Sequence, residues 1–116
     1  MCALAPYLRL SGQLYGNPHG LGPGLFTPGM TRHLDFPDIA SLTCPHPLLI
    51  IAGRQDPLFP VPSVDAAFDT LRRVYTSQNA LKRLETHWYD APHRFSLPMQ
   101  ALAFDWLDRW LQAGQR

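Results

Sequence analysis

The sequence lacks the residues that would define a disulfide scaffold, a metal site or a nucleic-acid surface. Its 116 residues include only two cysteines, Cys2 and Cys44, which are too few for a disulfide framework and lack zinc-site spacing. Ten basic residues nearly balance nine acidic ones, for a formal charge of +1. The sequence contains no cluster of basic residues of the kind that binds nucleic acids. We therefore expect no cofactor, no metal and no nucleic-acid partner.

Long hydrophobic runs are also missing. The opening residues MCALAPYLRL contain a short apolar run that Pro6 interrupts, with no basic residue before it. Such a segment is a poor secretory signal and is far too short to span a membrane. We expect a soluble chain without a membrane partner, located in the cytoplasm.

Proline and glycine, by contrast, are plentiful, with twelve and eight residues. Most of the glycines lie between Gly16 and Pro37, and an irregular stretch of that length is unusual inside a compact domain. We treat residues 1–116 as one domain in three parts. Residues 1–15 are expected to hold one strand, residues 16–46 to form a Gly/Pro-rich connection with a helical turn near 38–42, and residues 47–116 to form a β-α-β-α unit.

The β-α-β-α unit follows from hydrophobic periodicity. Residues 47–53, PLLIIAG, form an unbroken apolar run, which is typical of a strand buried on both faces of a parallel sheet. Residues 84–89, LETHWY, predict a second strand. Apolar residues recur at spacings of three and four over 63–77 and 98–112, which predicts two helices. A helix between two strands implies a crossover connection and a parallel pair.

Local patterns within the two helices add further expectations. Ser63 follows Pro62 and has the side chain of a helix N-cap. Asp105 and Arg109 have the spacing of an ion pair within a helix. The helix over residues 98–112 is apolar on much of its circumference, so we expect it to cover more sheet than two strands provide.

Asp56 and His93 are the candidate functional residues. Asp56 lies just beyond the strand at 47–53, and His93 lies just beyond the strand at 84–89. In parallel sheets functional side chains gather at the carboxyl ends of the strands, so we expect the two side chains to meet. An Asp that accepts a hydrogen bond from a His ring orients that ring for proton transfer.

Four segments, in order, resemble a known family. They are PDIA at 37–40, PLLIIAGRQDPLFP at 47–60, APHRF at 91–95 and AFDWL at 103–107. Together they look like the C-terminal portion of the α/β-hydrolase superfamily, in particular its dienelactone hydrolase and acetyl xylan esterase-like branch. One departure is that Ala and Pro stand before the histidine, where the family usually has glycines.

The resemblance implies the C-terminal part of an α/β-hydrolase fold, apparently incomplete, with parallel strands and crossover helices. It further implies a carboxylic-ester hydrolase of the Ser-His-Asp type that acts on a small-molecule ester. In that family the residue matching Asp56 is the triad acid and the residue matching His93 is the triad base.

The nucleophile of such an enzyme is missing from the pattern. It normally stands in a Gly-x-Ser-x-Gly elbow, and here the nearest imitation, Ser11, has Arg9 and Gln13 in place of the glycines. Cys44 precedes a strand instead of following one, which suits an inert thiol. We therefore expect the isolated chain to be inactive, with an upstream half of the fold supplying the nucleophile.

A zinc site is a further possibility to weigh. Its candidate ligands are His19, His33, Cys44 and His46. Their spacing matches no compact zinc-binding motif, so we do not expect a metal site.

Two other interpretations remain open. The chain can be a non-enzymatic α/β remnant or interaction module, which associates with itself or with a separate N-terminal half. Its exposed sheet edge and the apolar face of its last helix would then form the contact. Alternatively, Asp56 and His93 are plain turn residues, beside Pro57 and Pro92, in an unrelated α/β domain.

Overall fold

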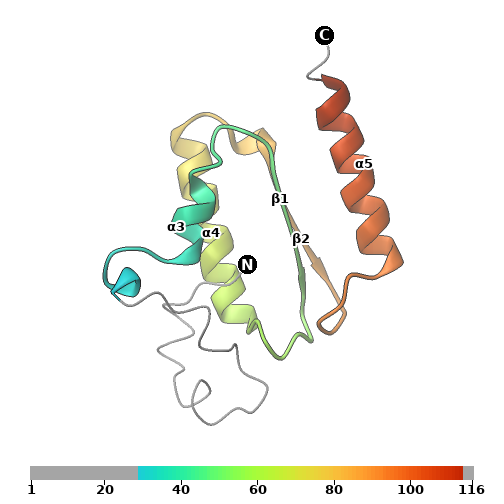
Figure 1. Cartoon of the computed structure of the whole chain (residues 1–116), viewed down its shortest axis with the longest axis horizontal. Helices are drawn as coiled ribbons and strands as arrows, with labels where there is room; N and C mark the ends of the chain where they lie inside the picture. Colours follow the sequence, from blue (N-terminus) through green and yellow to red (C-terminus); the bar gives the residue numbers. More distant parts are fainter. Residues whose placement is uncertain (1–28, 114–116) are drawn as a thin grey trace.

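The computed structural model describes residues 29–113 (Figure 1). The strand predicted within residues 1–15 lies outside this range. The described elements are a two-stranded sheet, three α-helices and two short 3-10 helices, in the following order: η2 (Met30–Arg32), α3 (Phe36–Ser41), β1 (Leu48–Gly53), α4 (Val61–Ser77), η3 (Leu81–Arg83), β2 (Leu84–Tyr89) and α5 (Leu97–Ala113). The chain therefore has the mixed α/β character that its periodicity predicted.

The sheet consists of β1 and β2, which pair in parallel. The register runs from Leu48 opposite Leu84 to Gly53 opposite Tyr89, so both strands end at the same edge of the sheet. The two predicted strands and their parallel arrangement are confirmed. Because the strands point the same way, the loops that leave them emerge side by side.

The sheet is covered by helices on both faces. Helices α3 and α4 lie on one side of it and α5 lies on the other (Figure 1). The core between the sheet and α4 is apolar, because the buried residues of α4 recur at helical spacing and meet the strands. Its members are Ala40, Ile50, Val64, Phe68 and Leu71, with Leu48, Ala52, Phe59, Leu84 and Trp88 packed against them.

Helix α4 begins earlier than predicted, and Ser63 is not its N-cap. Pro60 holds the N-cap position, and its carbonyl accepts from the backbone N–H groups of Ser63 and Val64, at 2.9 and 3.1 Å. Pro62 in the first turn has no N–H to cap. As a result, Ser63 is the third residue of the helix instead of its cap. Its hydroxyl is buried with no hydrogen-bond partner among the described residues.

Helix α3 also begins earlier than the predicted turn at 38–42. Asp35 caps it by accepting from the N–H of Phe36, and the Asp38 carboxylate accepts from the N–H of Asp35, both at 2.7 Å. This reciprocal arrangement is a capping box in which Asp takes the place of the usual Glu. The two carboxylates start the helix at Phe36 because they satisfy donors that its first turn leaves without partners.

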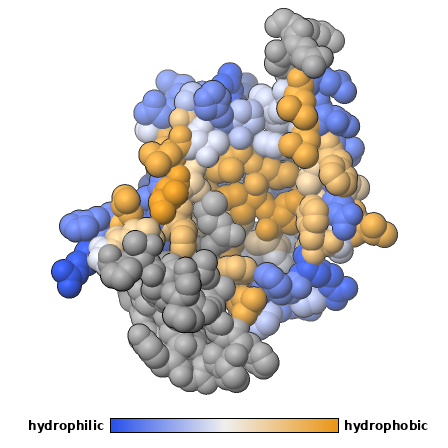
Figure 2. Space-filling model, in the orientation of Figure 1, coloured by the Kyte–Doolittle hydropathy of each residue, from blue (hydrophilic) through white to orange (hydrophobic). Residues whose placement is uncertain are grey.

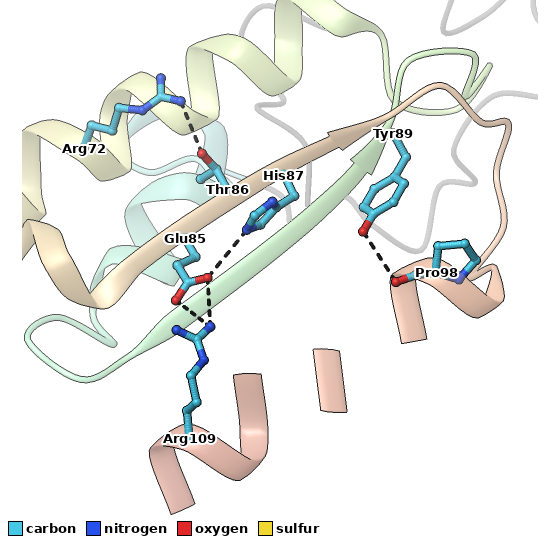
Figure 3. Close-up of polar contacts among 7 residues, drawn as sticks. All are labelled: Arg72, Glu85, Thr86, His87, Tyr89, Pro98 and Arg109. Carbon is cyan, nitrogen blue, oxygen red and sulfur yellow. Dashed lines mark hydrogen bonds and ion pairs between the residues drawn. The ribbon is translucent and has the colours of Figure 1, made fainter. Parts of the chain in front are cut away.

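The contact between α5 and β2 overturns one predicted pair. Arg109 bonds to Glu85 and not to Asp105, with its Nη2 3.0 and 3.2 Å from the two carboxylate oxygens (Figure 3). Nε2 of His87 lies 3.5 Å from the same carboxylate. Glu85 is half-buried on the sheet, so its attraction for Arg109 is screened less than that of an exposed neighbour on the helix. Tertiary packing therefore decides the partner.

The packing of α4 on the sheet predicts a stability difference between two leucines. Leu71 is completely buried, whereas Leu81 is 48% exposed. We expect Leu71→Ala to lower the free energy of unfolding by about 3 kcal/mol, because it leaves a cavity in the core. The matched variant Leu81→Ala should cost less than about 1 kcal/mol. Urea denaturation followed by circular dichroism measures both, and equal losses would contradict this account of the core.

Candidate active site

Asp56 lies in the tight turn that follows β1. Its backbone N–H donates to the carbonyl of Gly53 at 3.3 Å, and its Oδ1 accepts from the N–H of Leu58 at 2.9 Å. This is the local bonding that makes Asp common before a turn proline. The bond occupies one carboxylate oxygen and fixes the side chain. The second oxygen, Oδ2, is left to face the neighbouring loop.

The loop that carries His93 is tied to the loop that carries Asp56. Beyond the last strand residues, the N–H of Arg54 donates to the carbonyl of Tyr89 at 2.8 Å, and the N–H of Gln55 donates to the carbonyl of Ala91 at 3.1 Å. The Gln55 side-chain amide also donates to the carboxylate of Asp90 at 2.7 Å. Strand-like pairing therefore continues past the sheet and aligns the two loops.

Gly53 permits this close approach. A Cβ atom at position 53 would overlap the carbonyl oxygen of Ala91 and would lie 3.1 Å from that of Pro92. Both obstacles are backbone atoms, so no side-chain rotation could relieve the clash. Only glycine lets the chain leave β1 directly beneath the loop that holds His93.

Asp56 and His93 consequently meet. Nδ1 of His93 lies 2.8 Å from Oδ2 of Asp56. The Asp56 side chain is only 8% exposed, whereas that of His93 is 57% exposed. An ionised carboxylate can only accept, so the neutral His93 ring donates through Nδ1–H and carries its lone pair on Nε2. The Phe59 ring, at 5.8 Å between centroids, packs beside the imidazole.

The pair borders a pocket of about 290 Å³ at the carboxyl ends of the strands. Its described lining is mostly apolar and comes from the end of β1, the two loops, and the first turns of α4 and α5. The lining residues are Ile51, Ala52, Gly53, Asp56, Phe59, Val64, Pro92, His93, Arg94, Phe95 and Met99. Among these residues there is no serine, threonine or cysteine. The arrangement can hold and transfer a proton next to a small apolar group, but its described part supplies no nucleophile.

The other candidate residues do not join this site. Cys44 precedes β1, at the opposite end of the strand from Asp56, and is a partly buried free thiol. Ser63 is buried within α4, and Ser11 lies outside the described residues. Of the imagined zinc ligands, His19 also lies outside them. Within residues 29–113, no three His, Cys, Asp or Glu side chains gather where they could hold a metal ion.

Three features of the site had not been predicted. They are the Phe59 ring beside His93, the hydrogen bond between Gln55 and Asp90, and the steric need for Gly53. Only Gly53 had a signal in the sequence, because a glycine that ends a buried run often marks a close backbone approach. The other two features depend on residues that are distant in the chain and meet only once the strands pair.

The chain was compared with protein-family models, with curated proteins and with solved structures, and none of them matches. The helices formed by residues 29–113 are each too short or too polar to cross a membrane. The resemblance to α/β-hydrolases therefore stays a prediction from the residue pattern.

The short Nδ1 contact predicts the tautomer of His93. At about pH 8.5, where a histidine is ordinarily neutral, we expect the ring to carry its proton on Nδ1 because Asp56 accepts from it. Asp56→Ala should lower the population of this tautomer, whereas Asp69→Ala, at an exposed position of α4 away from the two loops, should leave it unchanged. Long-range ¹H–¹⁵N NMR correlations of the ring nitrogens distinguish the tautomers. An Nε2–H ring in the unmodified chain would refute the assignment.

A second prediction concerns Gly53. Gly53→Ala should lower the free energy of unfolding by about 1–3 kcal/mol, since overpacking against rigid backbone forces the loops apart. It should also lower the Nδ1–H population of His93, because the separated loops weaken the bond to Asp56. Gly29→Ala is a suitable control, since nothing lies within 4 Å of its Cβ position, although its positive φ adds some strain. Retention of the tautomer in Gly53→Ala would argue against this role for the glycine.

Proposed function

We propose that this chain carries the acid and the base of a carboxylic-ester hydrolase of the Ser-His-Asp type. The observation that supports the proposal is the 2.8 Å contact between Nδ1 of His93 and Oδ2 of Asp56, at the carboxyl ends of two parallel strands. The contact uses the ring nitrogen that an orienting carboxylate uses in such enzymes, and it leaves the other nitrogen available for proton transfer.

The chemistry follows from this geometry. A serine hydroxyl attacks the ester carbonyl while Nε2 of His93 takes its proton, and the protonated ring then gives that proton to the leaving alcohol. Water attacks the resulting acyl-enzyme, again with His93 as base, and the serine is released. Asp56 holds the ring in the required tautomer and stabilises the imidazolium that forms in both steps. Burial of Asp56 strengthens this interaction by keeping water away from the carboxylate.

The pocket suits a small ester. Apolar side chains from β1, α4 and α5 surround the acid-base pair, among them Ile51, Val64 and Met99. They favour an apolar acyl or alcohol group, because its transfer from water is favourable. The exposed side of His93 leaves room for both the substrate and a nucleophile.

The nucleophile must come from outside the described pocket lining, because that lining supplies no hydroxyl or thiol. We infer that a further segment bearing a serine elbow completes the site. This proposal treats the chain as the C-terminal part of an α/β-hydrolase domain and expects it to be inactive by itself.

The first test is an esterase assay on the 116-residue chain. We expect it to hydrolyse p-nitrophenyl acetate no faster than its His93→Ala variant, since general-base catalysis without a nucleophile or oxyanion hole contributes little to this reaction. Turnover that disappears in His93→Ala would contradict the expected inactivity and would place the nucleophile within this chain.

The second test adds the missing part. The chain is co-expressed with a polypeptide encoded upstream that contains a Gly-x-Ser-x-Gly elbow. Turnover should appear, and a fluorophosphonate probe should label the elbow serine. His93→Ala should abolish both signals, and Asp56→Asn should reduce kcat by about 10⁴-fold. Gln78→Ala, on the exposed end of α4, is the control. Turnover and labelling that persist in His93→Ala would overturn the proposal.

A second candidate function is favoured by a different observation. Large apolar side chains of α5 are exposed, and within the described residues each strand pairs along one edge only. Such surfaces are typical of proteins that associate. In this alternative the chain is an interaction module, and the Asp56–His93 bond serves only to join the two loops.

A further inference from the structure

Helix α5 is apolar around most of its circumference. Met99 is buried and Trp106 and Trp110 are half-buried, so this side of the helix is covered. A second set of apolar residues on the helix is exposed, and we call it the outer stripe. It consists of Leu97 (79% exposed), Ala101, Phe104 (58%), Leu107 (41%) and Leu111 (66%). Figure 2 shows hydrophobic surface along α5 as well as between α5 and the layer of α3 and α4.

The outer stripe runs along the whole helix. Leu97, Phe104 and Leu111 recur every seven residues, the spacing that keeps side chains on one line of a helix. At 1.5 Å per residue the stripe is about 21 Å long. The polar remainder of the helix is narrow, because it consists mainly of Asp105, Arg109 and Gln112, and Arg109 is bound to Glu85. Helices that are apolar on nearly all sides are normally buried, so this stripe is expected to bind another apolar surface.

The stripe is complementary to itself. We propose that it binds the α5 helix of a second copy of this chain, antiparallel, with the twofold axis at Phe104. In that register Phe104 meets its own counterpart. Leu97 lies opposite Leu111 of the second copy, and the small Ala101 lies opposite the large Leu107. A twofold contact requires each residue and its opposite to be compatible in both directions, and these pairs satisfy that condition.

Charge favours the antiparallel orientation over the parallel one. Asp108 is exposed and lies on the same helix face, between the residues of the outer stripe. The antiparallel register places it opposite Gln100 of the second copy. One N–H of the Gln100 amide donates to the carbonyl of Phe95 at 2.8 Å, and a side-chain amide has a second N–H to offer. A parallel pair would instead bring the two Asp108 carboxylates together, which is destabilising.

The size of the contact determines how tightly the copies associate. One helix pair buries less than the roughly 1,200 Å² that marks the lower end of standard interfaces. We therefore expect a reversible dimer whose population rises with protein concentration. This inference is independent of ester hydrolysis and holds whether or not the chain contributes to an enzyme.

Sedimentation equilibrium of the full 116-residue chain tests the association. We expect a monomer–dimer equilibrium in the unmodified chain. Phe104→Asp should raise the dimer dissociation constant at least tenfold, because it places two carboxylates on the axis. Asp105→Asn, one residue away on the polar strip, should leave the constant within about twofold. Far-UV circular dichroism confirms that each variant is folded. A monomer at all concentrations, or a dimer that Phe104→Asp does not weaken, overturns the proposal.

Disulfide trapping tests the register in the full chain with Cys2→Ser and Cys44→Ser. Under mild oxidation we expect Phe104→Cys to cross-link with itself. Leu97→Cys and Leu111→Cys should each remain uncross-linked alone but should form a heterodimer when mixed. Asp105→Cys is the control for random collision. Rapid self-linking of Leu97→Cys would indicate a parallel pair, and linking of Asp105→Cys as fast as Phe104→Cys would indicate no specific interface. Either result contradicts the antiparallel dimer.

Discussion

The parallel pairing of β1 with β2, extended past Gly53 into the following loops, is the constraint on which the rest of the structure depends. The register brings both carboxyl ends to one edge, and glycine lets the two loops approach there without a clash against Ala91. The Asp56–His93 contact is a consequence of this approach. A shift of one residue would turn every side chain to the other face and separate the pair.

The same small sheet explains the unusual surface of α5. Two strands lie about 4.8 Å apart, so the face they present is narrower than a helix of about 10 Å diameter. The sheet can bury one side of α5 and no more, which leaves Phe104 and Leu111 exposed. A second α5 would cover this excess of apolar surface, because the outer stripe lies on the side of the helix opposite Met99 and the two tryptophans.

The proposed chemistry of the site depends on the unequal exposure of Asp56 and His93. Asp56 is held by Leu58 and largely removed from solvent, while His93 faces outward. A fixed carboxylate behind a mobile proton is the arrangement that general-base catalysis needs, because the carboxylate stabilises the charged ring without moving. The turn role of Asp56 and its bond to His93 are compatible, since they use different oxygens of the same carboxylate.

The sequence by itself determined the two strands, the helices after them and the placement of Asp56 and His93 at strand ends, because hydrophobic period and chain order are local properties. Only the tertiary structure decided what meets across the fold. Arg109 binds Glu85 on β2 and not a neighbour on its own helix. Position 53 requires glycine because the backbone of Ala91 lies against it. Such contacts join residues far apart in the chain, so no local pattern encodes them, and they form when burial brings the elements together.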